Sequence, residues 1–294
     1  MAQRPRGPGQ GSTTSNLFDS PLGPKLSVLA QLLEPAITRR ESDSVLLFGL
    51  PTAGKGMLSR ALATSIRQST RVFRTVVIKA DVSKPNVKKF ARPRSAIDAL
   101  WNQVNDPEAG QDLSLINSVL IIRGLESISE EQPGWFESRW GPQMVSLIGG
   151  DALFTVTLGI TSDPLSMDPV FKSKFTKVLH VPPQDRSQIP DWIGWVGIPG
   201  EFVEPLTVEI LELAEQLGKE FVGPGALNRE LKAVKKTLAS NPEVNISDFI
   251  PRIVKNGFID SSEKEQYEYD HDSLIKGSDL LEEMLNPDGQ RQTA

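Results

Sequence analysis

The 294-residue sequence contains no cysteine and only two histidines, His180 and His271. Without cysteine the chain can form neither a disulfide framework nor a thiolate metal site, and two histidines are too few for a multi-histidine metal centre. We therefore predict no protein-held metal site of either type. The absence of cysteine also fits an intracellular, cytoplasmic protein, because disulfides are mainly a feature of oxidising compartments.

The sequence also lacks long apolar runs. No run approaches the roughly 18 residues that a membrane-spanning helix requires, so we expect no membrane segment. The stretch 1–16 is basic and rich in Gly, Pro, Ser and Thr, and no apolar region follows it as in a secretory signal. Such a composition buries too little apolar surface to offset the entropy of ordering, so residues 1–20 are predicted to be disordered.

Acidic residues predominate only near the end of the chain. The net charge is −5, but ten acidic and three basic residues between Asp260 and Ala294 give that segment a charge of −7. The other residues therefore carry about +2 and are not repelled from polyanions. We predict that residues 259–294 form an acidic tail. Its short amphipathic end is either a docking site for a protein partner or a solvated segment.

Short apolar runs alternate with amphipathic stretches over the first two thirds of the chain. The runs predicted as strands are 44–50, 71–82, 115–125, 152–164 and 177–183. The stretches predicted as helices are 23–37, which should end near Pro35, 54–69 and 95–105. Runs that are apolar on both faces are typical of buried parallel strands. The alternation predicts an α/β fold with a doubly wound parallel sheet in residues 21–188.

The pattern changes after this region. Residues 206–221 and 226–240 have the periodicity of amphipathic helices, and no strand is predicted between them. We predict a small all-helical lid domain at 189–258. Trp192 and Trp195 lie at the start of this lid, where they are expected to pack the lid against the core or to form a subunit contact.

The stretch 44–62, SVLLFGLPTAGKGMLSRAL, has the outline of a phosphate-binding loop. In the pattern G-x-x-x-x-G-K-[ST], glycines allow tight turns, successive N–H groups surround phosphate oxygens, and the lysine reaches the outer phosphates. Gly49, Gly54 and Lys55 match this pattern, but Gly56 stands where a hydroxyl that binds Mg²⁺ is expected. The predicted nucleotide-binding residues of the loop are Gly49, Pro51, Thr52, Ala53, Gly54, Lys55, Gly56 and Met57.

The loop taken alone also resembles the adenylate kinase loop, G-x-P-x-A-G-K-G-T. Met57 departs from that pattern, because the kinase family has threonine at this place. No series of arginines in the sequence resembles the phosphate clamp of those kinases. A nucleotide kinase therefore stays an alternative to the main interpretation.

Over residues 21–258 the order of segments resembles an AAA+ ATPase. In that family the strand corresponding to SVLIIRGLES ends in Asp-Glu, where the aspartate holds Mg²⁺ and the glutamate activates water. Arg123 and Gly124 occupy these two acidic places here, and an arginine beside the metal site would repel Mg²⁺. Glu126 would share the strand face of Gly124 if the strand continued, and it could substitute for the acids only in part.

The resemblance implies roles for three further residues. Thr161 sits where the sensor-1 strand carries a polar residue that senses the outer phosphate. Lys174, in SKF, matches the arginine finger that reaches into a neighbouring subunit, and lysine keeps the charge without the planar fork. Arg229, in GPGALNREL, matches the sensor-2 position of the lid, although it also fits an exposed helical charge.

A basic segment, SKPNVKKFARPR, follows the second predicted strand. It places Lys88, Lys89 and Arg92 around Phe90. In AAA+ rings this region often faces the central pore. Basic groups neutralise phosphates and an aromatic ring can stack on a base, so the segment is predicted to contact nucleic acid or a chain in the pore, with a solvated basic loop as the alternative.

The resemblance as a whole implies a protein that binds ATP or ADP and assembles into homo- or hetero-oligomers with AAA+ subunits. The metal hydroxyl, both acids and the finger arginine are replaced, so we expect weak or absent hydrolysis and Mg²⁺ that the protein holds only weakly. The expected function is an oligomeric assembly or regulatory subunit. The alternatives are an active motor ATPase using Glu126 and Lys174 in catalysis, a nucleic-acid-binding AAA+ protein, and the nucleotide kinase.

Overall fold

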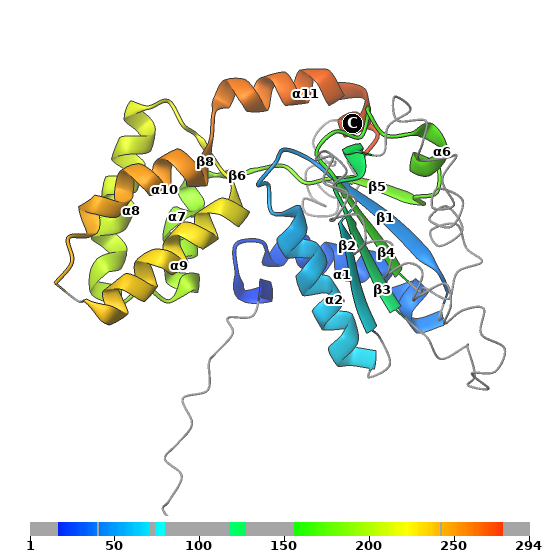
Figure 1. Ribbon diagram of the computed structural model, residues 1–294, viewed down its shortest axis with the longest axis horizontal. Coiled ribbons are helices and arrows are strands. Elements are labelled where there is room, and N and C mark those ends of the chain that lie inside the picture. The colour runs from blue at the N-terminus through cyan, green and yellow to red at the C-terminus, as the bar shows by residue number, and fades with distance from the viewer. Residues whose placement is uncertain are drawn as a thin grey trace, which may run out of the picture.

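Five parallel strands form the central sheet of the molecule (Figure 1). The computed structural model describes residues 17–39, 41–70, 74–79, 118–127, 156–241 and 243–278. The strand order is β2-β3-β4-β1-β5. The strands are β1 (Asp43–Phe48), β2 (Arg74–Lys79), β3 (Ser118–Arg123), β4 (Val156–Thr161) and β5 (Lys177–His180). All their pairings are parallel, which confirms the predicted doubly wound α/β core.

The register of the strands brings their carboxyl ends to one edge of the sheet. Phe48 at the end of β1 pairs with Thr161 at the end of β4. Arg123 at the end of β3 pairs with Ile160, one residue earlier. Because ligands of open α/β sheets bind outside the carboxyl ends of the strands, the loops that follow these residues define the place to look for a site.

Two long helices cover the sheet next to this edge. They are α1 (Gly23–Arg39) and α2 (Lys55–Thr70). The sequence predicted that the first helix ends near Pro35, and this was wrong, because the helix continues through the proline to Arg39. A proline inside a helix removes one backbone hydrogen bond at a cost of about 3 kcal/mol. Burial of Leu33 and Ala36 on either side offsets that cost.

The chain is ordered slightly earlier than predicted. Residues 1–16 lie outside the described part of the chain, but a 3-10 turn, η1 (Leu17–Asp19), forms within the segment predicted to be disordered. Leu17 and Phe18 pack against the hydrophobic core. A Cβ on Gly23 would lie 2.1 Å from the carbonyl oxygen of Phe18, so a glycine is needed where the turn meets α1.

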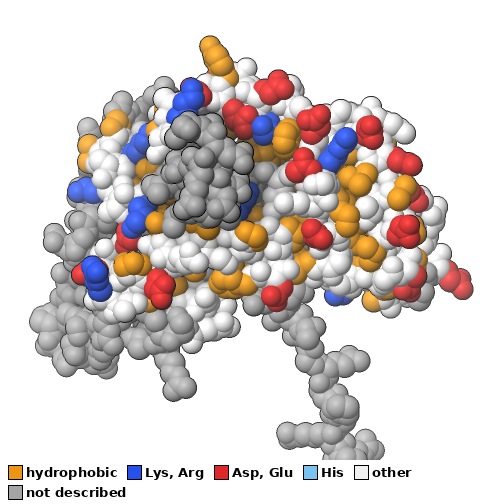
Figure 2. Space-filling model, turned by 180° about the vertical axis from the view of Figure 1, so that it is seen from behind, with side chains coloured by type: hydrophobic (Ala, Val, Ile, Leu, Met, Phe, Trp, Pro, Cys, Tyr) orange, Lys and Arg blue, Asp and Glu red, His pale blue; other side chains and the backbone are white. Residues whose placement is uncertain are grey.

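The lid is mainly helical, as predicted. Its helices are α7 (Ile189–Val196), α8 (Gly200–Gln216), α9 (Pro224–Ser240), the 3-10 turn η7 (Ile246–Phe249) and α10 (Ile250–Gly257). α8 begins before its Pro205 rather than after it. Figure 2 shows that acidic side chains predominate on the lid half of the face seen from behind. No helix in the described residues is both long and apolar enough to cross a membrane.

A small antiparallel sheet at the base of the lid was not predicted. It joins β6 (Gln184–Asp185), β7 (Phe221–Val222) and β8 (Phe258–Ile259) in that order. β7 lies between α8 and α9, where the sequence predicted no strand. A strand of two residues is too short to show a hydrophobic period in the sequence. Such strands form only where distant segments of the chain pack side by side.

The predicted acidic tail begins with a docked helix. α11 (Ser261–Lys276) runs from the lid towards the carboxyl end of the sheet (Figure 1). His271 of this helix is buried, and Tyr267 packs against the hydrophobic core. The first half of the tail is therefore anchored through His271 and Tyr267, while many of its other side chains are exposed. It packs on the chain's own core, and residues 279–294 lie outside the described part.

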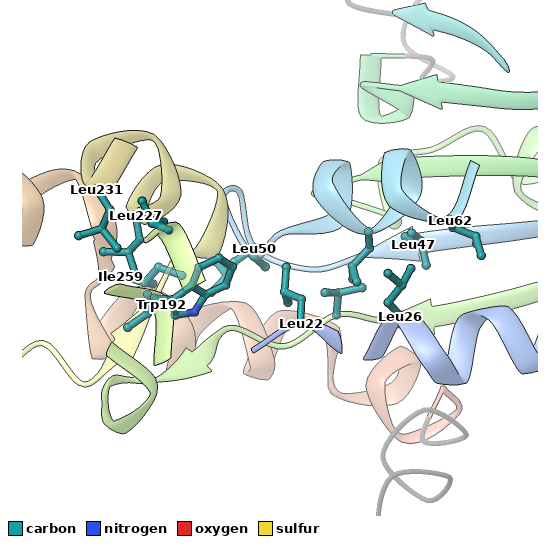
Figure 3. Packing of buried hydrophobic residues seen from close by; sticks show 14 of the residues in the cluster. Leu22, Leu26, Leu47, Leu50, Leu62, Trp192, Leu227, Leu231 and Ile259 are labelled. Atoms are coloured by element: carbon teal, nitrogen blue, oxygen red, sulfur yellow. The ribbon is translucent and has the colours of Figure 1, made fainter. Parts of the chain in front are cut away.

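One hydrophobic cluster links the lid and the core. Figure 3 shows it running from Leu231 and Leu227 in the lid, past Trp192 and Leu50, to Leu26 beside the sheet. The remaining short elements are α6 (Pro169–Lys172), η5 (Leu125–Ser127) and η6 (Arg186–Gln188).

Trp192 connects the lid to the core. Its side chain is fully buried, and its indole Nε1 donates a hydrogen bond to Oε1 of Gln184 at 2.7 Å. Nε2 of Gln184 in turn donates to the carbonyl oxygen of Pro21, ahead of α1, at 2.8 Å. Trp195 packs edge-on against Trp192, with ring centroids 5.3 Å apart. Within this chain, Trp192 packs the lid against the core, which was the first of the two expected roles.

Candidate functional site

The loop between β1 and α2 turns on backbone conformations that favour glycine. Gly49 has φ +148° and Gly54 has φ +95°. A Cβ on Gly49 would lie 2.4 Å from the carbonyl oxygen of Val181, so no larger residue fits there. Thr52 also has a positive φ, of 71°, and such strain is often found where a loop is shaped around a ligand. The loop thus turns tightly in front of α2, as a phosphate cradle must.

Lys55, the first residue of α2, folds back over this loop. Its Nζ donates hydrogen bonds to the carbonyl oxygens of Gly49 at 2.5 Å and Leu50 at 2.6 Å. Burial lowers the pKa of Lys55 to about 8; the charge of Glu126 opposes this shift and the charge of Arg123 adds to it. The ammonium group is thus held at the loop and largely removed from water, where it interacts strongly with an anion.

A cavity of about 310 Å³ opens in front of the loop. Three of its lining side chains are cationic, namely Lys55 and Arg60 from α2 and Arg123 from the end of β3. The full lining is Thr52, Gly54, Lys55, Gly56, Met57, Arg60, Arg123, Ile160 and Gly225. None of these described lining residues is acidic. The cavity is therefore suited to an anion, and its place at the amino end of α2 adds the partial positive charge of the helix dipole.

The guanidinium of Arg123 lies where a side chain at position 56 would lie. A Cβ built on Gly56 would lie 1.8 Å from Nη2 of Arg123, so the guanidinium fills the volume that a serine or threonine side chain would take. Burial lowers the pKa of Arg123, and repulsion from Arg60 lowers it further. Arg60 was not among the predicted site residues. The signal that could have identified it is its spacing of four from Gly56, which places both on one helix face.

Mg²⁺ is the ion that a phosphate-binding loop of this kind implies, and the residues present do not fit it as a protein-held ion. Gly56 has no side-chain oxygen to offer, and Arg123 presents positive charge at the place of the expected aspartate. In the described part of the chain, no group of three or more His, Asp or Glu residues is arranged to hold a metal ion. The loop, Lys55 and the two arginines instead fit the phosphate chain of a nucleotide.

Glu126 is held at the end of β4. β3 ends at Arg123, and Gly124, with φ +75°, turns the chain into η5, so the strand does not continue to Glu126. Oε2 of Glu126 accepts hydrogen bonds from Oγ1 of Thr161 at 2.9 Å and from the backbone N–H of Ser162 at 3.2 Å. The structure brings these two predicted residues together at the edge of the sheet, but neither lines the cavity.

The lid contacts the loop through the start of α9. The backbone N–H of Gly225 donates to the carbonyl oxygen of Thr52 at 3.2 Å. A Cβ on Gly223 would lie 2.4 Å from Oγ1 of Thr52, so a glycine is required for this close approach. Any ligand in the cavity therefore lies at the junction of lid and core.

The side chain of α9 that approaches the loop is Asn228 rather than the predicted Arg229. Nδ2 of Asn228 lies 4.0 Å from the sulfur of Met57. The Arg229 side chain is 70% exposed, lies 3.4 Å from the carboxylate of Glu230 and does not line the cavity. In this conformation Arg229 is the exposed helical charge that was its second interpretation. The one-residue offset depends on how α9 is rotated, which the sequence pattern does not fix.

Lys174 lies at the opposite end of the sheet. Its carbonyl oxygen accepts a hydrogen bond from Oγ of Ser44 at 2.8 Å, and Ser44 is the second residue of β1 whereas the loop follows the last. A strand of this length spans roughly 20 Å, so Lys174 cannot reach the cavity of its own chain. Its role towards a neighbouring subunit stays a prediction. Lys88, Lys89, Phe90 and Arg92 lie outside the described residues.

Side chains from α11 cover the edge of the sheet beside the loop. Tyr267 stacks on His271 with ring centroids 4.2 Å apart, and lies 6.3 Å from the ring of His180 at the end of β5. Nε2 of His271 lies 3.5 Å from Oδ1 of Asp163, which follows β4. Burial lowers the pKa of His180 to about 4, helped by the nearby charges of Lys25 and Lys55. Sequence reasoning did not find this aromatic stack, because His180 is far in the chain from Tyr267 and His271.

Comparison with known proteins supports the fold. No protein-family model matches the chain, and no curated protein matches its sequence. The FIGL-1 AAA domain in complex with ADP superposes with a TM-score of 0.56 at 17% identity, over 87% of this chain and 89% of that chain. A mutant of Thermotoga maritima RuvB gives 0.50 at 17% identity, over 80% and 69%. C. elegans PCH-2 gives 0.50 at 12% identity, over 78% and 67%. The chain therefore has the fold of the FIGL-1 AAA domain.

Proposed function

We propose that this protein binds ATP or ADP at the loop of Gly49 to Met57, hydrolyses ATP weakly or not at all, and works as an intracellular oligomeric assembly or regulatory subunit. The observation that carries the proposal is the contact of Arg123 with Gly56. The glycines and the lysine of the phosphate-binding loop are present, while the guanidinium fills the place of the hydroxyl that would bind the metal. Phosphoryl transfer depends on positioning and on neutralising charge around the phosphates, usually with Mg²⁺.

Two further observations support nucleotide as the ligand. The FIGL-1 AAA domain, which shares the fold, was crystallised in complex with ADP. The cavity lies between Lys55 and the start of α9 at Gly225, so a bound nucleotide would touch both the core and the lid. Binding at such a junction can stabilise one arrangement of the two parts, which is how a regulatory subunit would respond to nucleotide.

The proposed oligomer rests on the finger role that the AAA+ resemblance gives to Lys174. From the far end of the sheet, this cation could fill that role only towards a nucleotide bound by another copy or another subunit of the same fold. Light scattering at micromolar protein, with and without ATP, is the measurement. We expect a species larger than the monomer. A monomer under both conditions would contradict the proposed assembly, but it would leave nucleotide binding unaffected.

Nucleotide binding is tested by calorimetry with ATP on wild type and on Lys55→Ala. We expect measurable binding to wild type and a loss of at least tenfold, about 1.4 kcal/mol, in the variant, because the lysine is the loop's buried cation. Arg39→Gln, a change at the exposed end of α1, serves as the matched control for loss of one positive charge. Equal affinity in all three proteins would mean that the loop does not bind nucleotide.

A working ATPase is the second candidate, and the position of Glu126 favours it. The carboxylate is hydrogen-bonded to Thr161 of the sensor-1 strand, and its charge acts on Lys55. Steady-state phosphate release at saturating ATP distinguishes the two. Turnover of roughly 1 per second or more that disappears in Glu126→Gln would replace the proposed weak hydrolysis with active catalysis. The predicted nucleic-acid contact of Lys88, Lys89 and Arg92 stays a prediction, which a salt series with DNA or RNA would test.

A further inference from the structure

The cavity in front of the loop carries more positive charge than a phosphate-binding loop alone provides. Lys55, Arg60 and Arg123 all line it. The charge of Glu126 acts on Lys55, and this carboxylate accepts hydrogen bonds from the hydroxyl of Thr161 and the N–H of Ser162. The three cations therefore face the cavity with no acidic residue among the described lining. An arrangement of this kind is unfavourable when the cavity holds only water, and it becomes favourable when an anion enters.

Arg123 is positioned by the backbone on both sides. Its strand, β3, is paired with β2 and β4, so its Cα is fixed within the sheet. On the other side, the missing side chain of Gly56 admits the guanidinium to the first turn of α2. A guanidinium at this place is a planar fork of N–H donors that can bind phosphate oxygens in pairs.

The same geometry opposes a hydrated divalent cation. Mg²⁺ requires oxygen ligands at close to octahedral geometry, whereas this corner of the cavity presents N–H donors and positive charge. A magnesium ion that arrives on a nucleotide would have to displace the guanidinium or be released. The residues thus discriminate between two forms of one ligand, the free nucleotide and its magnesium complex.

We propose that the cavity selects the metal-free phosphate chain of a nucleoside di- or triphosphate, and that Arg123, assisted by Arg60, supplies the charge that Mg²⁺ supplies in related folds. This inference rests on the proposed nucleotide binding. Its consequence is that Mg²⁺ competes with the protein for the nucleotide. The site then responds to the concentration of free nucleotide rather than to that of its magnesium complex.

The test is calorimetric titration of the full chain with ATP, once with EDTA and once with Mg²⁺ in excess over ATP. We expect tighter binding in EDTA, by about tenfold or more. ADP and tripolyphosphate are titrated under the same two conditions. Binding of tripolyphosphate as tight as that of ATP would show that the cavity recognises only the phosphate chain. The preference for the metal-free form would then stand, but the ligand would not have to be a nucleotide.

Two variants and one control assign the effect to Arg123. Arg123→Gln removes the charge and shortens the side chain while keeping a polar end, so affinity in EDTA should fall about tenfold. The double variant Gly56→Ser with Arg123→Asp restores two oxygen ligands and should need Mg²⁺ for binding. Arg39→Gln should behave as wild type. Thermal unfolding of each variant first verifies that it is folded; should the double variant fail, Arg123→Gln alone decides.

The possible results distinguish a failure of the metal-free site from a failure of nucleotide binding itself. Binding that needs both Lys55 and Mg²⁺ would overturn the metal-free site and keep the nucleotide-binding protein. Unchanged affinity of Arg123→Gln in EDTA would also overturn it. No binding of ATP, ADP or tripolyphosphate under either condition would overturn both proposals together.

Discussion

At the scale of single residues, Gly56 decides what the site can hold. A serine or threonine there would bring a hydroxyl to the first turn of α2, and its Cβ alone would collide with Arg123. A side chain at position 56 would therefore require the guanidinium end of Arg123 to move aside. The two residues thus place a cation, and no side-chain oxygen, at the first turn of α2.

The binding of nucleotide should weaken as the pH rises above 8. The pKa of Lys55 in the free protein is lowered to about 8 by burial, so its charge is lost between about pH 7 and 9. An anionic ligand favours the charged lysine, and the phosphates of ATP are already ionised in this range. We therefore expect ATP affinity to fall about tenfold between pH 7 and 9, measured by calorimetry at constant ionic strength.

Lys55→Arg is the control for this pH effect. Arginine stays charged throughout the range, so the variant should bind more weakly than wild type at pH 7 but with an affinity that no longer changes with pH. A wild-type affinity that is constant from pH 7 to 9 would show that Lys55 does not contact the phosphates.

At the scale of elements, α11 is the clearest case of structure that the sequence did not reveal. Its sequence is acidic and lacks a strong apolar stripe, which favoured a solvated tail. The packing includes Tyr267 and His271, which stack at a spacing of four along the helix. Local patterns report continuous apolar faces, and two aromatic contacts with a distant strand do not produce one.

Tyr267→Ala should destabilise the protein by about 2 kcal/mol, since it removes a half-buried aromatic side chain from the edge of the sheet. Tyr269, on the same helix, is 81% exposed, and Tyr269→Ala should change the stability by less than about 0.5 kcal/mol. Thermal and denaturant unfolding of both variants provide the comparison. Equal effects of the two substitutions would mean that α11 is not docked through Tyr267.

The difference between local sequence patterns and packing of distant segments also explains which elements the sequence predicted. Five strands were identified because each is a short apolar run between polar turns, and β1 and β4 are buried along nearly their whole length. The loop was identified because glycine and lysine at fixed spacing reflect backbone chemistry. The continuation of α1 through Pro35, the two-residue β7 and the rotation of α9 that presents Asn228 were missed. Each is decided by packing between segments that are distant in the sequence.

At the scale of the whole molecule, several contacts join lid and core, besides the hydrogen bond from Gly225 to Thr52. The hydrophobic cluster is continuous between them, Gln184 connects Trp192 to Pro21 by two hydrogen bonds, and α11 passes from one to the other (Figure 1). Such contacts are more extensive than those of domains linked only by a flexible segment. The junction also contains the loop, so nucleotide binding and the stability of the whole chain should be coupled.

We therefore expect lid and core to unfold in one cooperative transition. Calorimetric and van't Hoff enthalpies should agree, and far-ultraviolet dichroism and tryptophan fluorescence should give the same midpoint. Trp192→Phe keeps most of the apolar packing but leaves Oε1 of Gln184 without its buried donor, which should lower the stability by about 1–3 kcal/mol and move both probes together. ATP at about 100 times its dissociation constant should raise the stability by about 2.7 kcal/mol in each protein. Two separate transitions in wild type, with only the lid responding to Trp192→Phe, would show instead that the joint at Gln184 does not transmit stability between the two parts.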